Sequence, residues 1–125
     1  MYKELIVTVI ILILIFSLDI ITNNYTSYAC DELSRSLDNL KLDIQENKIA
    51  ENKIDDIFAN WKKHYHILAY YIEHDELEKV ETELTKLRAD IKSEKYEEYT
   101  MEIDTTIFIL QHIENKEKFN IQNIF

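Results

Sequence analysis

The chain has 125 residues and carries 24 acidic side chains against 14 Lys and Arg, which gives a formal net charge of −10. This balance argues against nucleic acid and against an anionic lipid surface as ligands, because both require a basic face. The sequence contains no glycine and no proline. It therefore lacks the residues that most hairpin turns and phosphate-binding loops need, and helices joined by short polar turns are expected.

An apolar segment from Leu5 to Ile21 lies close to the N-terminus. As a helix it is about 25 Å long, short but adequate for a hydrocarbon core of roughly 30 Å. Asp19 is tolerable if it lies at headgroup depth, and Tyr25 and Tyr28 follow where interfacial aromatic residues are favoured. The segment predicts a single membrane-spanning anchor within residues 1–24, followed by a domain of residues 25–125.

The charges that flank this segment predict its orientation. Lys3 precedes it, whereas Asp31 and Glu32 follow it, so the positive-inside rule favours a single-pass cell-membrane protein with a cytoplasmic N-terminus and an extracytoplasmic C-terminal domain. The alternatives are a cleaved signal, a lipoprotein signal ending at Cys30, and a buried core helix. No small-residue cleavage site follows the run and Cys30 lies far downstream, which favours a retained anchor.

The C-terminal domain shows four amphipathic patterns in which apolar residues alternate at intervals of three and four. Thr26 or Ser27 is expected to cap the first helix. The predicted fold is all-α, a transmembrane helix followed by an antiparallel four-helix bundle. The apolar positions are Leu33, Leu37, Leu40 and Ile44; Ile54, Phe58, Trp61, Tyr65, Leu68 and Ile72; Leu77, Val80, Leu84, Leu87 and Ile91; and Tyr99, Ile103, Ile107 and Leu110.

The step of five residues from Ile72 to Leu77 breaks the phase of the pattern. It predicts a turn near His74 and Asp75. Asp75 with Glu78 resembles a capping box, which would start the third helix there.

The last helix is expected to end near Ile113 or Glu114. The remaining tail is too apolar to lie free in water and is expected to pack back on the bundle or on a partner. In a rival architecture, the anchor helix runs unbroken through Asn23 and Asn24 into the next segment. The apolar residues of the tail are Phe119, Ile121, Ile124 and Phe125.

A stretch rich in aromatic and histidine residues is the best candidate for chemistry. His66, Tyr70 and His74 follow at intervals of four, which would place them on one helix face within reach of a shared ion. They form no defined zinc motif, so exposed or hydrogen-bonded histidines are favoured and no cofactor is expected. Trp61 is interpreted as part of an aromatic core stripe rather than a ligand pocket. Cys30 and the serines lie in no nucleophile motif, and enzymatic activity is not expected.

The order of features along the chain carries a resemblance: a short anchor, a helix with Trp61, the sequence HDEL from His74 into an acidic helix, and the C-terminal stretch LQHIENKEKFNIQNIF. In this order the chain resembles the family catalogued as domain of unknown function 4363, small membrane-anchored helical proteins of low-GC Gram-positive bacteria. Trp61, His74, His112 and Asn123 match its pattern. The resemblance implies a membrane-tethered helical protein and supplies no catalytic residue.

Two functions follow from these observations. The first is a protein-interaction or structural module of the cell envelope, tethered to the bilayer through residues 5–21 and bound to a protein partner there. The second is a sensory or ligand-binding bundle with an interhelical pocket near residues 61–74. The candidate interaction residues are Trp61, His74, His112, Phe119, Ile121, Asn123, Ile124 and Phe125.

Overall fold

Four α-helices make up the described chain, and the all-α prediction is confirmed. The computed structural model describes residues 1–46 and 51–124, and the side chains of all of these except residues 96, 97 and 120–124. The helices are α1 (Tyr2–Gln45), α2 (Glu51–Leu68), α3 (His74–Lys92) and α4 (Tyr96–Ile124).

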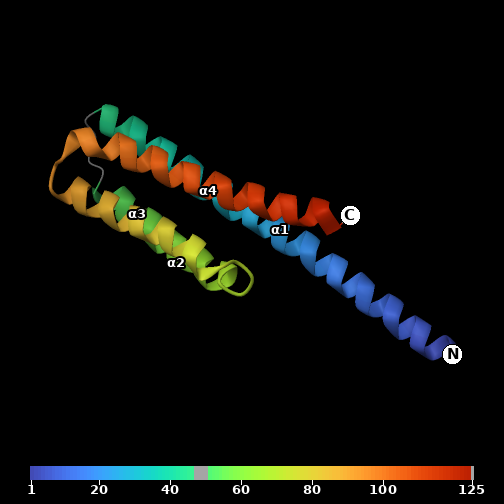
Figure 1. Cartoon of the computed structure of the whole chain (residues 1–125). Helices are drawn as coiled ribbons and strands as arrows, with labels where there is room; N and C mark the ends of the chain where they lie inside the picture. Colours follow the sequence, from blue (N-terminus) through green and yellow to red (C-terminus); the bar gives the residue numbers. More distant parts are fainter. Residues whose placement is uncertain (47–50, 125) are drawn as a thin grey trace.

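The helices pack as an antiparallel bundle in which each contacts two neighbours. Consecutive helices pack against each other, and α4 closes the bundle by packing along α1. The α1–α4 and α3–α4 interfaces are the most extensive. Figure 1 shows α1 projecting as a single rod beyond the end of the bundle toward the N-terminus. The predicted four-helix bundle is therefore confirmed, with the second half of α1 as its first member.

Helix α1 is unbroken over 44 residues, about 66 Å at 1.5 Å per residue. Thr26 lies in its interior and not at a start, so the predicted cap at Thr26 or Ser27 is wrong. The Thr26 hydroxyl donates to the carbonyl of Thr22 at 2.8 Å, a bond within the helix rather than a capping bond. The rival architecture, a helix running through Asn23 and Asn24, is the one found, and the division at residue 24 stays a prediction.

The two halves of α1 differ in what surrounds them. With the exception of Phe16, the large apolar side chains from Leu5 to Ile21 are 46–62 % exposed, so the bundle does not cover them. From Thr26 onward, one stripe of the helix is buried in the bundle, namely Thr26, Ala29, Cys30, Leu33, Leu37, Leu40 and Asp43. A change from apolar on all sides to apolar on one side marks where α1 enters the bundle.

The core forms one contiguous cluster contributed by all four helices. Trp61 is its largest fully buried side chain. It packs edge to face against Tyr65, with ring centroids 6.1 Å apart. The core residues of α2, α3 and α4 follow the predicted spacing of three and four, except that Ile57 is buried where Phe58 was expected and Phe58 is only partly buried. They are Ile54, Ile57 and Leu68 on α2; Leu77, Val80, Leu84, Leu87 and Ile91 on α3; and Tyr99, Ile103, Leu110 and Ile113 on α4.

The predicted break near His74 is confirmed, but the predicted capping box is wrong. Helix α2 ends at Leu68, and α3 begins at His74 with Glu73 in the N-cap position. No side chain caps this terminus. Asp75 lies instead in the first turn of α3, where its charge is favoured by the helix dipole.

Helix α4 continues to Ile124, so the predicted end near Ile113 or Glu114 is wrong. The polar stretch after Ile113 is a solvated part of the helix, and Lys118 bonds Glu114 across one turn at 2.9 Å. Phe119 is 61 % exposed and does not pack back on the bundle. The other tail residues, Ile121, Ile124 and Phe125, lie outside the described side chains.

The turn from α3 to α4 requires a left-handed residue in a chain without glycine. Glu94 has φ of 55°. The amide of Lys95 donates to the carbonyl of Asp90, and the amide of Glu94 donates to that of Ile91. These two bonds form a Schellman motif, which closes α3 at Ser93. The left-handed conformation costs a residue with a Cβ about 1 kcal/mol or more.

We predict that Glu94→Gly stabilises the bundle by about 1 kcal/mol, because glycine adopts this conformation without the Cβ clash. The measurement is urea unfolding of the full chain in detergent. Ser93→Gly is the matched control, since Ser93 has φ of −96° and should gain nothing. Equal effects of the two changes would contradict the assignment of strain to Glu94.

Candidate functional site

A partly buried polar network surrounds His64 where α1 enters the bundle. The His64 side chain is almost fully buried between α1 and α2. Its ring lies 5.7 Å from that of Tyr25 and 5.9 Å from that of Tyr28, measured between centroids. Nδ1 of His64 lies 2.7 Å from the Tyr25 hydroxyl. Asn60 Nδ2 donates to Glu32 Oε1 at 2.6 Å and joins the same two helices.

The neighbours of His64 determine which ring nitrogen carries the proton. Nε2 lies 3.3 Å from Glu32 Oε2, a contact that is too poorly aligned for a hydrogen bond. A carboxylate has no proton to give, so Nε2 carries the hydrogen that faces it. In the neutral ring Nδ1 is then the acceptor, and the Tyr25 hydroxyl donates to it. The network thus runs in one direction, from Tyr25 through the imidazole to Glu32.

The pKa of Glu32 is lowered in this network, and the pKa values of Tyr25 and Tyr28 are raised. The hydrogen bond from Asn60 lowers the pKa of Glu32, and the nearby Tyr28 hydroxyl and His64 ring act in the same direction against the effect of burial. Burial raises the pKa of the Tyr25 hydroxyl, and the charge of Glu32 adds to this. The hydrogen bond to Glu32 raises the pKa of Tyr28. Glu32 is therefore held as an anion and both tyrosines as neutral donors.

A second contact joins α1 to the turn that follows α2. The Tyr71 hydroxyl lies 2.9 Å from the Thr26 hydroxyl and donates to the carbonyl of Thr22 at 3.2 Å. Both contacts lie on the part of α1 that directly follows the apolar segment. Together with His64, they fix the point at which the exposed rod becomes part of the bundle.

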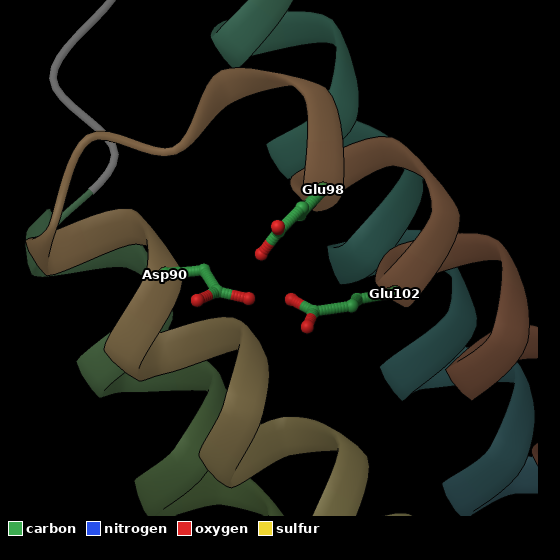
Figure 2. Close-up of side chains that lie close together, drawn as sticks. All are labelled: Asp90, Glu98 and Glu102. Atoms are coloured by element: carbon green, nitrogen blue, oxygen red, sulfur yellow. The ribbon is translucent and has the colours of Figure 1, made fainter.

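A cluster of three carboxylates lies at the other end of the bundle. Asp90 is near the end of α3, and Glu98 and Glu102 are in the first turns of α4; Figure 2 shows the three side chains converging. Their oxygen atoms lie within 4.8 Å of one another. Burial, together with the hydrogen bond and the charge of Asp90, raises the pKa of Glu102 to about 7.

The cluster can hold a proton between Asp90 and Glu102, which removes the repulsion between two neighbouring anions. Its oxygens also suit a hard cation such as Ca²⁺, which takes about six to eight oxygen ligands, so water would have to supply the rest. The arrangement contains no nucleophile paired with a base. Its chemistry is that of a charge-sensitive contact between two helices.

The family model described as Domain of unknown function (DUF4363) matches residues 20–124. The chain belongs to the DUF4363 family. The match begins at the end of the apolar segment and covers the whole bundle, so the resemblance stated from the sequence is confirmed. No curated protein and no solved structure matches the chain.

The residues proposed from sequence as metal ligands do not share a helix face in this DUF4363 protein. His66 lies in the last turn of α2, Tyr70 in the turn that follows, and His74 at the start of α3. All three are exposed, Tyr70 to 90 %. The predicted spacing assumed one continuous helix, but α2 ends at Leu68. His74 Nδ1 contacts the Tyr65 hydroxyl instead, at 3.5 Å.

The candidate interaction residues fall into three groups. Trp61 is fully buried, so it belongs to the core and presents no exposed surface to a partner. His74, His112 and Phe119 are exposed and remain available for contact. Ile121, Asn123, Ile124 and Phe125 lie outside the described side chains.

Cys30 is buried in the interior of α1. Burial raises the pKa of its thiol to about 12. A thiol of that pKa, inside a packed helix, is a poor nucleophile for lipid attachment or disulfide exchange. Its environment fits the interpretation of Cys30 as a small apolar core residue.

An exposed apolar face on α4 was not predicted from the sequence. Met101 and Phe108 are 66 % and 69 % exposed and, with Thr100, Asp104 and Thr105, line a shallow surface hollow. Their spacing of seven residues is a detectable signal, because it places both on one face, separate from the buried stripe. The His64 network and the carboxylate cluster give no such signal, since each joins residues from different helices.

We predict that Glu32→Gln lowers the free energy of unfolding by about 1 kcal/mol at neutral pH, in the range of one net hydrogen bond. The folded pKa of Glu32 lies below its ordinary 4.5, so its charge contributes stability above pH 4.5. That contribution disappears as the pH falls through the folded pKa, and the variant and the native chain should converge there. Urea unfolding at several pH values measures the difference, with Glu78→Gln as an exposed control.

We predict the opposite pH dependence for Glu102→Gln. Because the folded pKa is about 7 against 4.5 when unfolded, native stability falls as the pH rises between these values. The variant avoids this loss, so it should be more stable than the native chain at pH 8 and equal to it near pH 4.5. The same unfolding assay measures it, and a difference that is independent of pH would contradict the assignment.

Proposed function

We propose that this chain is a membrane-tethered, non-enzymatic interaction module of the cell envelope, with its N-terminus in the cytoplasm and its helical bundle outside. The supporting observation is the first half of α1. It is the one helix of the described residues that is long and apolar enough to cross a membrane, and none of that stretch is buried in the bundle. A rod of this kind exposed to water would be costly, at about 25 cal/mol per Å² of apolar surface.

The tether explains why a single helix serves two environments. Residues 5–21 lie in the bilayer, where a helix satisfies its own backbone hydrogen bonds. The Tyr25–His64–Glu32 network then fastens the emerging helix to α2. A bundle fixed in this way faces its partners with a constant orientation.

The α4 face with Met101 and Phe108 is the surface we propose for a protein partner. Exposed Met and Phe side chains on one face are typical of interaction sites rather than of a solvated helix. Asp104 lies between Met101 and Phe108 along α4 and is already paired with Lys41 of α1, at 2.8 Å. The face therefore presents two exposed apolar side chains, and the charge between them is neutralised.

We predict that the full chain resists extraction from membranes by alkaline carbonate, while a chain lacking residues 2–18 is recovered in solution with its helical content retained. In intact protoplasts, added protease should degrade the bundle.

A photoreactive residue replacing Phe108 should crosslink to a partner, and one replacing Glu78 on α3 should not.

Extraction of the full chain would overturn the tether, and a bundle protected from protease would overturn the orientation. Crosslinking at neither position, or equally at both, would contradict the partner surface while leaving the tether intact.

A further inference from the structure

One end of the bundle lies at the height where α1 leaves its apolar segment. The Tyr71 hydroxyl bonds the carbonyl of Thr22, so the α2–α3 turn reaches this height directly. Asn60 of α2 pairs with Glu32 of α1. Counting forward from Asn60 and back from Glu32 by the same number of residues places Tyr70 level with Thr22 along the bundle axis. Figure 1 shows the turn on the side of the bundle from which α1 projects.

Helix α4 descends to the same height. Lys41 of α1 pairs with Asp104 of α4 at 2.8 Å. Because the two helices are antiparallel and rise equally per residue, a residue as far after Asp104 as another is before Lys41 lies at the same level along the bundle. Phe119 is therefore level with Thr26, and the end of α4 with Ile21. In Figure 1, the C-terminal end of α4 lies along α1 where the rod emerges. Two of the other three helices thus end beside residues 21–26.

This end carries large apolar side chains that no part of the described bundle covers. Tyr70 is 90 % exposed, Phe119 61 % and Ile67 47 %. They come from the last turn of α2, the turn after it and the end of α4, and both helices pack against α1. We name these three residues the basal ring.

The height of the basal ring matches the interfacial region of a bilayer. If residues 5–21 span the hydrocarbon, the headgroup region beyond them is about 5–7 Å thick, which corresponds to roughly four residues of helix. Thr22 to Thr26 occupy that depth, and Tyr70 and Phe119 are level with them. Aromatic residues are favoured at this depth because their rings are amphipathic.

Charge indicates the kind of lipid surface. The whole chain is acidic, which disfavours attraction to anionic lipid. Near the basal ring, Lys116 lies between Glu73 and Glu76, with nitrogen–oxygen distances of 3.7 and 3.4 Å, and offsets only one of their two charges. Apolar insertion, rather than ionic attraction, is the contact that this end can make.

We propose that the basal ring of Ile67, Tyr70 and Phe119 seats in the headgroup region of the bilayer that α1 spans. The proposal rests on the tethered function proposed above. It gives the bundle a second attachment to the membrane, through the two helices that flank α1. The bundle then stands on the surface and cannot swing about its anchor.

Nitroxide labels on single cysteines test the proposal in the full chain, reconstituted in phosphatidylcholine vesicles. In a Cys30→Ala background, labels are placed by Tyr70→Cys, Phe119→Cys, Phe108→Cys and Leu12→Cys. Phe108 is the matched control, because it lies on the same helix as Phe119 and is similarly exposed but is far from the ring. Accessibility to oxygen relative to a water-soluble nickel chelate reports the depth of each label.

Labels at positions 70 and 119 should show an oxygen-to-nickel accessibility ratio several-fold above that at position 108 and below that at position 12. Ratios at 70 and 119 equal to that at 108, with a deep label at position 12, would overturn the basal ring and leave the tether standing. A label at position 12 as accessible to nickel as that at 108 would instead overturn the tether itself.

Discussion

The continuity of α1 is the constraint on which the rest of the structure depends. One helix contributes both the exposed apolar rod and a full side of the bundle, and α2 and α4 pack directly against it. The stripe of Ala29, Leu33, Leu37 and Leu40 sets the face on which the other helices assemble. A break near Thr26 would separate the rod from the bundle, and the contacts of His64 and Tyr71 hold the segment on either side of that point.

The absence of glycine and proline affects how the helices end. Helix α3 ends through a glutamate in a conformation that glycine normally supplies, and it starts without a side-chain cap. Pairs of charged side chains also join neighbouring helices, as Arg88 of α3 does with Asp55 of α2 at 2.7 Å. Such exposed pairs are individually weak, so the apolar core must supply most of the stability.

The parts of the fold that depend on local pattern could be predicted from the sequence. The break in phase between Ile72 and Leu77 located the turn before α3, and the alternation of three and four identified the core, including Trp61. The end of α4 was misjudged because a polar stretch after Ile113 can be either a terminus or a solvated helix. Thr26 was misread as a cap because a threonine hydroxyl can also bond the preceding turn of its own helix.

The candidate site was harder to predict, because it is made by contacts between helices. Tyr25 and His64 are 39 positions apart in sequence, and nothing in the spacing of either residue indicates that they meet. The carboxylates of Asp90 and Glu102 converge only once α3 and α4 are packed. Conversely, the regular spacing of His66, Tyr70 and His74 indicated a shared face that the end of α2 removes.

An uninterrupted α1 also means that the rod and the bundle share one rotational phase. Each residue turns the helix by about 100°, so the direction in which Met101 and Phe108 face is fixed relative to the apolar segment by the number of residues between that segment and Thr26. A rotation or displacement of the apolar segment therefore rotates or displaces the whole bundle. In the tethered arrangement proposed above, the helix would transmit a movement of its membrane end to the far side of the bundle.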